Sequence, residues 1–399
     1  MKLSSLYTQI LLSVLLAAFT GAFLGDYIVF LQPIGKIYFN ILIMVTIPFV
    51  ATGLIYGLGS LPLFLAKKLL LPAFYVFLFI TVIGLGIVIL FSQLLPEVKS
   101  RISVVSSEST TLSIVNSLID LLVPSNFISD FSKAYMPAIA IFGLIVGLTV
   151  IFIPNKAVFL SSLRIFNNII IKILTFLGFL APIAIFAHLS VVFGTITLLQ
   201  FEKIAIFLLV ITMGSFLITF WVLPYLLGPL IGLRYSALIR QSSEILLLVA
   251  MTSLPSLAIP RLITLLKAYE KKEEHKSANL LPEKEKIILT QALPTLSFNF
   301  AQVGNMFLII FIFFSAFYFR SPLSFSQKTI AYILAVPSSW GGQVAAPMEV
   351  LFFDQFLKIT HLNINLYFGL HYISRIFVSL ASAMGMYLFC LLAWHWHHK

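Results

Sequence analysis

The sequence predicts an all-α polytopic membrane protein with eight transmembrane helices and two re-entrant helical hairpins. Of its 399 residues, 60% are hydrophobic and only 10% are charged, whereas an ordinary soluble domain carries about 25% charged residues. Long apolar runs containing many of the 39 Phe recur along nearly the whole chain. A soluble enzyme of this length would need more charge to keep its surface hydrated, so the composition excludes one.

The net charge of +11 does not indicate a nucleic-acid-binding protein. The basic residues stand mostly between apolar runs, where the positive-inside rule places them in membrane proteins. The single cysteine, Cys390, cannot form an intrachain disulfide. No nucleic-acid partner and no disulfide framework are therefore expected.

The transmembrane helices are predicted from apolar runs, because a helix needs about 20 predominantly apolar residues to cross the hydrocarbon. The first run resembles a signal peptide, but no Ala-x-Ala site closes it and similar runs follow at once, so we interpret it as a retained helix. The predicted spans are residues 8–30, 37–62, 69–95, 136–154, 164–195, 203–230, 287–318 and 365–393.

Two further apolar stretches, 244–266 and 329–357, are interrupted near their middles. The first contains Ser253-Leu254-Pro255-Ser256, and the second contains Pro337-Ser338-Ser339-Trp340-Gly341-Gly342. Proline removes a backbone donor and clashes with the preceding turn, so each stretch is interpreted as a hairpin of two half-helices. Kinked continuous helices are the alternative. Broken backbone at membrane depth survives only where it is buried or lines a cavity, and paired broken segments point to a transporter binding site.

The layout divides the chain into two predicted parts. Residues 1–240 hold the first six spans, and residues 241–399 form a core of hairpin 1, helix 7, hairpin 2 and helix 8. The polar segment 96–135 is placed outside, and the charged segment 267–286 is placed inside as a solvated linker. With both termini inside, the inner segments carry the larger share of Lys and Arg, as the positive-inside rule expects.

Ionisable residues within apolar stretches are functional candidates, because each costs several kcal/mol at membrane depth. Arg375 lies in the last predicted span. Its planar guanidinium could hold a carboxylate bidentately. The competing interpretation is an arginine that donates hydrogen bonds to carbonyls of a broken helix.

Glu349 follows the turn of hairpin 2, and Asp354 lies further toward its exit. A buried carboxylate titrates high enough to carry a proton near neutral pH, so Glu349 is a candidate for proton coupling. An equally weighted alternative places Glu349 in an aqueous vestibule. Arg261 could extend its head group toward water or cap half-helix carbonyls, and Glu244 is placed at the inner water interface.

Several segments together resemble the dicarboxylate/amino acid:cation symporters, the family of the glutamate transporters. The resemblance rests on the order and spacing of GAFLG at 21–25, LQPIGKIYFN at 31–40, IMVTIPF at 43–49, LVPSN at 122–126, IFGLIVG at 141–147 and LAPIAIFA at 180–187. It implies eight spans with two re-entrant hairpins, a homotrimer, and a location in the bacterial inner membrane. It also implies no catalytic residues and no cofactor other than a coupling sodium ion or proton.

The C-terminal half departs from that family. Where the family has Asn-Met-Asp-Gly-Thr, this chain has Asn299-Phe300-Ala301-Gln302-Val303, so the asparagine is kept and the carboxylate is missing. Arg375 is retained, whereas Ala383 replaces an acidic residue and Ser379 replaces a substrate-binding asparagine. Weak or absent sodium dependence is therefore expected, because hard cations favour carboxylate ligands. The absent carboxylates also disfavour a ligand with an ammonium group.

The resemblance implies a set of substrate-binding residues, with Asn299 also as a weak sodium ligand: Arg375, Ser253, Ser256, Ser338, Ser339, Gly341, Ser379 and Asn299. Three classes of function compete. The favoured one is a secondary transporter of a small anionic solute such as a dicarboxylate or an acidic amino acid. A degenerate, non-transporting sensor or scaffold is the alternative. An intramembrane enzyme is disfavoured, since the sequence offers no nucleophile–base pair.

Overall fold

The computed structural model describes residues 3–96, 126–132, 136–195, 198–253, 255, 258–274, 283–339 and 364–397. These residues form helices and no strands, which confirms the all-helical prediction for this part of the chain. Five segments in it are long and apolar enough to cross a membrane: Leu12–Tyr38, Leu70–Ser92, Glu202–Ile231, Ala292–Tyr318 and Ser374–Trp396. The full count of eight spans and two re-entrant hairpins remains a prediction.

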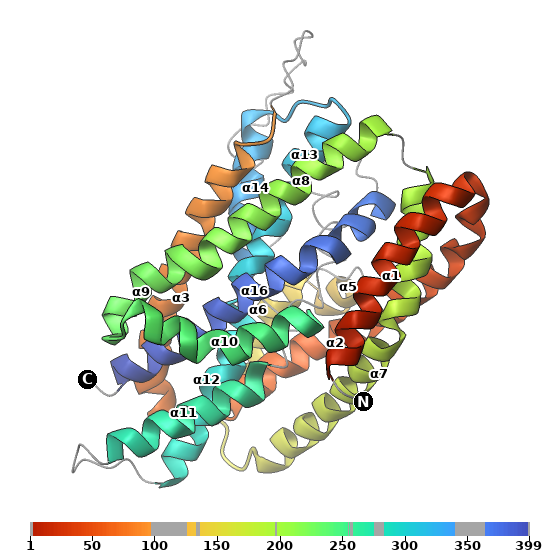
Figure 1. The fold of residues 1–399 in the computed structure, drawn as a ribbon. Helices are drawn as coiled ribbons and strands as arrows, with labels where there is room; N and C mark the ends of the chain where they lie inside the picture. The colour runs from red at the N-terminus through yellow and green to blue at the C-terminus, as the bar shows by residue number, and fades with distance from the viewer. Residues whose placement is uncertain are drawn as a thin grey trace.

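The first packing group contains α1 (Leu3–Leu24), η1 (Gly25–Leu31), α2 (Gln32–Gly59), α6 (Met136–Ile151) and α7 (Ala157–Thr195). Helix α1 packs along α7, and α2 packs along both α6 and α7 (Figure 1). Glycines permit these close approaches: a Cβ added at Gly194 would lie 2.6 Å from the carbonyl oxygen of Gly25, and one at Gly147 would lie 3.0 Å from Leu58 Cβ. Small residues at helix contacts are typical of membrane proteins, where dispersion rather than water exclusion holds helices together.

The second packing group is built around α16 (Ile364–His397), whose residues from Val378 to Trp394 are all buried. Helices from many parts of the chain pack against it (Figure 1). They include α3 (Leu63–Ser92), α8 (Leu198–Leu217), η2 (Ile218–Val222), α9 (Leu223–Ile231), α10 (Tyr235–Thr252), α11 (Ala258–Glu274), α12 (Glu283–Phe300) and η4 (Val303–Ile309), and α7 of the first group also contacts α16. The other described helices are α5 (Phe127–Ser132), α13 (Ile310–Tyr318) and α14 (Phe325–Ser338), and α14 packs against η4.

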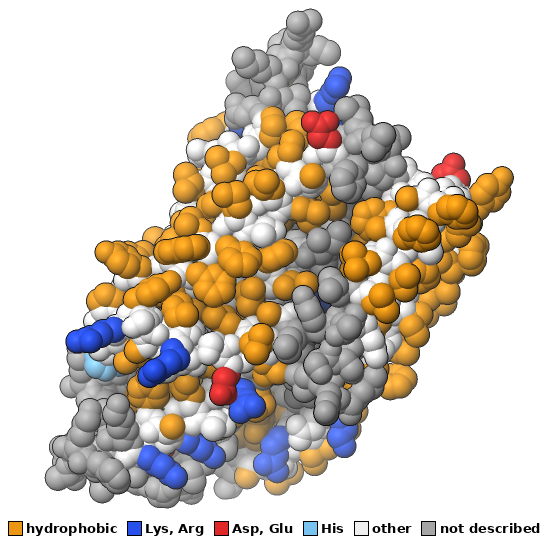
Figure 2. Space-filling model, in the orientation of Figure 1, with side chains coloured by type: hydrophobic (Ala, Val, Ile, Leu, Met, Phe, Trp, Pro, Cys, Tyr) orange, Lys and Arg blue, Asp and Glu red, His pale blue; other side chains and the backbone are white. Residues whose placement is uncertain are grey.

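The outer surface of the protein is apolar. Large hydrophobic side chains are exposed along the outer helices, for example Phe23, Phe74 and Phe176. Figure 2 shows hydrophobic side chains over the middle of one face, with basic side chains gathered toward the lower end. Both described ends of the chain lie toward that same lower end (Figure 1). This surface suits hydrocarbon rather than water.

Several observed helix bounds differ from the predicted spans, and one predicted break is observed. The predicted span 287–318 is interrupted after Phe300, where Ala301 and Gln302 leave the helical conformation and a 3-10 helix follows. The predicted hairpin 1 consists of α10 and α11, with a break between Thr252 and Ala258. Of the predicted hairpin 2, α14 and Ser339 are described, and its remainder lies outside the described residues.

Replacing Gly304 by alanine should destabilise the fold. A Cβ at Gly304 would collide with the carbonyl oxygen of Val378 and the Ser382 hydroxyl, so η4 must move away from α16. Overpacking of this kind costs about 1–3 kcal/mol. Thermal unfolding in detergent should show a lower midpoint than for the unchanged protein.

Gly86→Ala is the matched control, because nothing lies within 4 Å of a Cβ at Gly86 in α3. Its midpoint should be unchanged or slightly raised. Equal midpoints for the Gly304→Ala and Gly86→Ala variants would show that η4 does not pack tightly on α16.

Candidate functional site

The candidate site begins at the end of α10, where Ser253 turns the chain out of the helix. Ser253 has a φ of +53° and lies in the left-handed region, while its N–H donates to the Val249 carbonyl at 2.7 Å. Left-handed residues commonly end helices, although glycine is the usual choice. This turn directs the Ser253 carbonyl away from α10 and toward another helix.

The Ser253 carbonyl accepts two hydrogen bonds from α16. Arg375 donates through Nε at 3.2 Å, and Ser379 donates through its hydroxyl, also at 3.2 Å. Arg375 and Ser379 are one turn apart on α16 and therefore present side chains to the same face. The end of α10 is thus joined to one face of α16 at the retained arginine.

Arg375 is buried, with only 9% of its surface exposed. Within the part of the chain that the structure describes, no carboxylate forms an ion pair with it. The hydrogen bond to Ser253 matches the second of the two sequence interpretations, an arginine bonded to a broken-helix carbonyl. This hydrogen bond uses only Nε. The two terminal nitrogens of the guanidinium, Nη1 and Nη2, donate to none of the described residues.

A second hydrogen-bonded contact joins the base of hairpin 1 to α16. The side-chain oxygen of Gln241 on α10 accepts from Tyr269 of α11 at 2.6 Å and from Tyr387 of α16 at 3.2 Å. Burial raises the pKa of the Tyr269 phenol, so the hydroxyl stays protonated and able to donate. Tyr387 lies about 18 Å along α16 from Arg375, at 1.5 Å per helical residue. The α10–α11 pair therefore contacts α16 through hydrogen bonds at two positions, Ser253 and Gln241.

The second broken backbone lies between α12 and η4. Gln302 is fully buried and donates to the Phe298 carbonyl at 3.0 Å and to the Met386 sulfur at 3.3 Å, but its side-chain oxygen accepts nothing from the described residues. Asn305 is also fully buried, and neither atom of its amide has a described partner. Buried polar groups without partners are rare and each needs an explanation. The Asn305 N–H donates to the Gln302 carbonyl at 2.9 Å, so the two residues are joined by one backbone turn.

Helix α16 also packs against the break between α12 and η4, within a few turns of its contact with Ser253. Gly304 approaches Val378 and Ser382, and a Cβ at Gly385 would lie 2.6 Å from the Ala301 carbonyl oxygen. Arg375, Ser379, Ser382 and Gly385 follow one another at helical spacing of three or four residues. Both breaks consequently lie along one side of α16, within about three turns.

Three predicted residues of the site hydrogen-bond within their own helices. Ser338 and Ser339 at the end of α14 are buried and donate to Ala335 and Val336, each at 2.7 Å. Asn299 is 3% exposed and donates to Thr295 at 2.9 Å. Each of these side chains keeps oxygen lone pairs that can accept. The predicted residues Ser256, Gly341 and Glu349 lie outside the described residues.

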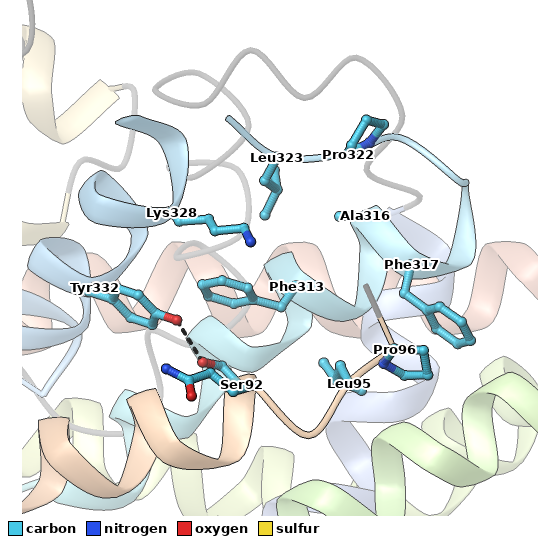
Figure 3. A pocket seen from close by; sticks show the side chains of 11 residues that line it. Ser92, Leu95, Pro96, Phe313, Ala316, Phe317, Pro322, Leu323, Lys328 and Tyr332 are labelled. Carbon is cyan, nitrogen blue, oxygen red and sulfur yellow. Dashed lines mark hydrogen bonds between the residues drawn. The ribbon is translucent and has the colours of Figure 1, made fainter. Parts of the chain in front are cut away.

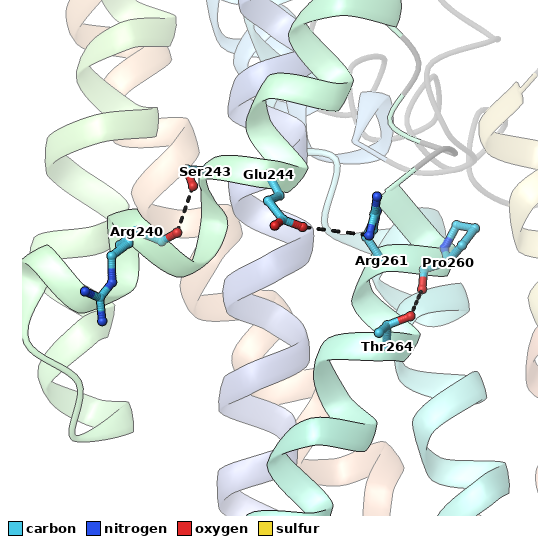
Figure 4. Close-up of polar contacts among 6 residues, drawn as sticks. All are labelled: Arg240, Ser243, Glu244, Pro260, Arg261 and Thr264. Carbon is cyan, nitrogen blue, oxygen red and sulfur yellow. Dashed lines mark hydrogen bonds and ion pairs between the residues drawn. The ribbon is translucent and has the colours of Figure 1, made fainter. Parts of the chain in front are cut away.

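Arg261 and Glu244 form an ion pair across the two arms of hairpin 1 (Figure 4). Their closest atoms are 3.8 Å apart, and the side chains are 59% and 77% exposed. Exposed pairs contribute little stability. Among the described residues Arg261 caps no half-helix carbonyl, and this exposed ion pair does not belong to the buried site.

A small hollow of about 110 Å³ lies between the end of α3 and the helices α13 and α14 (Figure 3). Lys328 extends toward Phe313 at its centre, and Ser92 and Tyr332 share a hydrogen bond of 2.8 Å at its edge. Arg375 does not line it. The hollow is thus separate from the contact between α10 and α16.

Sequence reasoning did not select Gln302 and Asn305 as site residues. The available signal was two amides that flank Gly304 inside a long apolar run, since polar side chains there are costly unless they have a role. Pattern alone did not place the break at Ala301, because no proline stands at that position.

The two donors to Ser253 should be energetically coupled. Ser379→Ala alone should lower the free energy of unfolding by about 0.5–1.5 kcal/mol, since Arg375 still donates to the Ser253 carbonyl. Adding Arg375→Met leaves that carbonyl without either donor, so the loss in the double variant should exceed the sum of the single losses by at least about 0.5 kcal/mol. Equilibrium unfolding of the four proteins in detergent measures this cycle.

Ser297→Ala provides the control, because the Ser297 hydroxyl bonds to Pro294 in its own helix and to Cys390, about 22 Å along α16 from Arg375 and away from the Ser253 carbonyl. Its effect should add to that of Arg375→Met. Strict additivity for Ser379→Ala as well would mean that the two side chains do not share an acceptor.

Comparison with protein families gives one match. The Sodium:dicarboxylate symporter family model matches residues 6–386, nearly the whole chain. Comparison with individually curated proteins gave no match. The family match confirms the resemblance found in the sequence.

Proposed function

We propose, from the premise that the chain belongs to the sodium:dicarboxylate symporter family, that it carries a small carboxylate solute across the membrane with Arg375 as the anion-binding group. Members of this family are cation-coupled symporters, so family membership supports an integral membrane transporter of a small solute and not an enzyme. The identity of the solute and the coupling are the proposed part.

The observation that carries the proposal is the state of Arg375. Its side chain is buried, is oriented by the Nε bond to Ser253, and has no carboxylate partner among the described residues. A buried cation without a counter-ion is strongly unfavourable. A carboxylate that docks on the two terminal nitrogens would neutralise this charge with a bidentate, charge-assisted contact. Orientation by Ser253 means that little rotamer freedom is lost when the anion binds.

The surroundings of Arg375 favour a carboxylate over an amino acid. On the described face of α16 the neighbouring side chains are hydroxyls and small groups, including Ser379, Ser382 and Ala383. An ammonium group would need a carboxylate or several oxygens nearby, and none of these side chains is acidic. A dicarboxylate is therefore the proposed solute, with an acidic amino acid as the second choice.

Transport would proceed by alternating access, with hairpin 1 and α16 moving together. Their two hydrogen-bonded contacts, at Ser253 and at Gln241, support motion as one body. The helices α12 to α14 pack on the same assembly, and the α1, α2, α6 and α7 group would provide the stationary scaffold. A homotrimer formed through that scaffold is part of the proposal.

The coupling cation would meet neutral ligands. The side-chain oxygens of Gln302 and Asn305 are buried acceptors without described partners, and the backbone is broken beside them. Neutral amide and carbonyl oxygens can hold sodium, but a hard cation prefers carboxylates. The proposed sodium site is therefore weak. Glu349 is proposed to carry a proton as the coupling ion instead of sodium.

Arg375→Lys should weaken dicarboxylate binding by roughly 1–3 kcal/mol, because a bidentate contact becomes a single one. Calorimetric titration of the purified protein with a series of small dicarboxylates measures the loss. The matched control is Arg261→Lys, since Arg261 is an arginine in an exposed ion pair of the same core.

Binding should be unchanged in the Arg261→Lys variant. Unaltered affinity in both Arg375→Lys and Arg375→Ala would remove Arg375 from the binding site. Retained dicarboxylate binding without any uptake into vesicles would favour a sensor over a transporter.

Uptake into proteoliposomes should persist when sodium is replaced by choline, with at most a shallow sodium dependence. The physical reason is the neutral ligand set at Gln302 and Asn305. Gln302→Met, which keeps the volume and removes the amide oxygen, should abolish the sodium response that remains. Glu349→Gln should make sodium-free uptake insensitive to a pH gradient while binding is kept.

Uptake that needs millimolar sodium and follows a steep curve would contradict the weak site. A pH response that survives Glu349→Gln would exclude Glu349 as the proton carrier.

A further inference from the structure

A groove of about 340 Å³ lies between the first turns of α3 and the end of α6, away from Arg375. Its α3 wall includes Leu63, Lys67 and Phe74, and its α6 wall includes Leu148 and Phe152. The α3 residues recur at helical spacing and so form one stripe on that helix. Apart from Lys67, the side chains that line the groove are apolar.

The groove opens on the outer surface of the protein. Phe74 and Phe152 are 55% and 67% exposed, and Leu71 beside them is also exposed. On the apolar surface of an integral membrane protein, exposed side chains of this kind suit hydrocarbon rather than water. An open apolar groove on such a surface fits a hydrocarbon chain, which gains dispersion contacts along both walls.

One end of the groove is basic. Lys67 is exposed there, and Lys68 follows it in the sequence. No Asp or Glu occurs in the sequence between Asp26 and Glu97 or between Asp130 and Glu202, which includes all of α3, α6 and α7. Each lysine or arginine near an anionic membrane surface contributes about 1 kcal/mol of attraction. The charge at this end therefore complements an anionic headgroup.

Hydrogen bonds from Lys156 connect the two walls of the groove near the start of α3. The Lys156 ammonium donates to the Leu61 carbonyl at 2.9 Å and to the Ile151 carbonyl at 3.4 Å. Leu61 precedes α3, and Ile151 ends α6 and lines the groove. This contact fixes the start of one wall against the end of the other.

We propose that this groove binds one anionic phospholipid, with an acyl chain between α3 and α6 and the headgroup phosphate against Lys67. The apolar lining selects a lipid over a free phosphate, and Lys67, the charged residue of the described lining, selects an anionic over a zwitterionic headgroup. The two walls belong to the two packing groups, since α3 packs on α16 and α6 packs on α2. A lipid held here bridges the two groups of helices.

Native mass spectrometry of the full-length protein tests this site. The protein is titrated with phosphatidylglycerol or with phosphatidylcholine of identical acyl chains, and the first lipid adduct is quantified. Phosphatidylglycerol should bind more tightly, and Lys67→Gln should weaken it by about fivefold without changing phosphatidylcholine binding. Lys36→Gln is the control, because Lys36 is also exposed but does not line the groove.

A second variant tests the apolar part of the groove. Leu148→Trp should fill the space between the walls and lower the affinity for both lipids, and its thermal midpoint in detergent confirms that the protein is folded. Equal affinity of the unchanged protein for the two lipids would overturn the headgroup assignment. Equal losses in Lys67→Gln and Lys36→Gln would overturn the site. Inorganic phosphate that displaces the lipid adduct would likewise overturn it, since the acyl chain would then contribute nothing.

Discussion

The organisation of the core depends on one carbonyl group. Ser253 ends α10 in a left-handed turn, and its carbonyl oxygen, which lies outside the helical hydrogen-bond pattern, needs donors from another element. Arg375 and Ser379 supply them from a single face of α16. The same bond fixes the guanidinium, so a requirement of the broken helix also orients the charged group that the proposed function uses.

The helix α16 is suited to this role by its small residues. Ser379, Ser382, Ala383 and Gly385 allow the backbones of α10 and η4 to approach it closely. Where backbones approach, their polar groups can be satisfied without water, which makes two interrupted helices tolerable in an apolar protein. At the second break, the side-chain oxygen of Gln302 and both amide atoms of Asn305 have no described partners. A transported cation or a water molecule would be bound most favourably at this break, because these unpaired polar atoms could contact it.

The sequence was sufficient where a rule is local. Proline and serine at 253–256 predicted the break in hairpin 1, and long apolar runs predicted the helices. The rules failed at Ala301, because the α12 to η4 break depends on how closely Gly304 fits against Val378 in a distant helix. For Arg375 the sequence left two partners open, a carboxylate or a carbonyl. Only the folded chain brings Ser253 to the arginine, since the two lie on different helices.

The central claim is that Arg375, oriented by Ser253, receives the solute carboxylate on its free fork. The most direct test is a cryo-EM structure of the protein with a bound dicarboxylate. The account predicts two carboxylate oxygens on the terminal nitrogens of Arg375 at about 2.7–2.9 Å, with the Nε bond to Ser253 retained. A dicarboxylate bound elsewhere, with protein groups occupying the whole guanidinium, would contradict it.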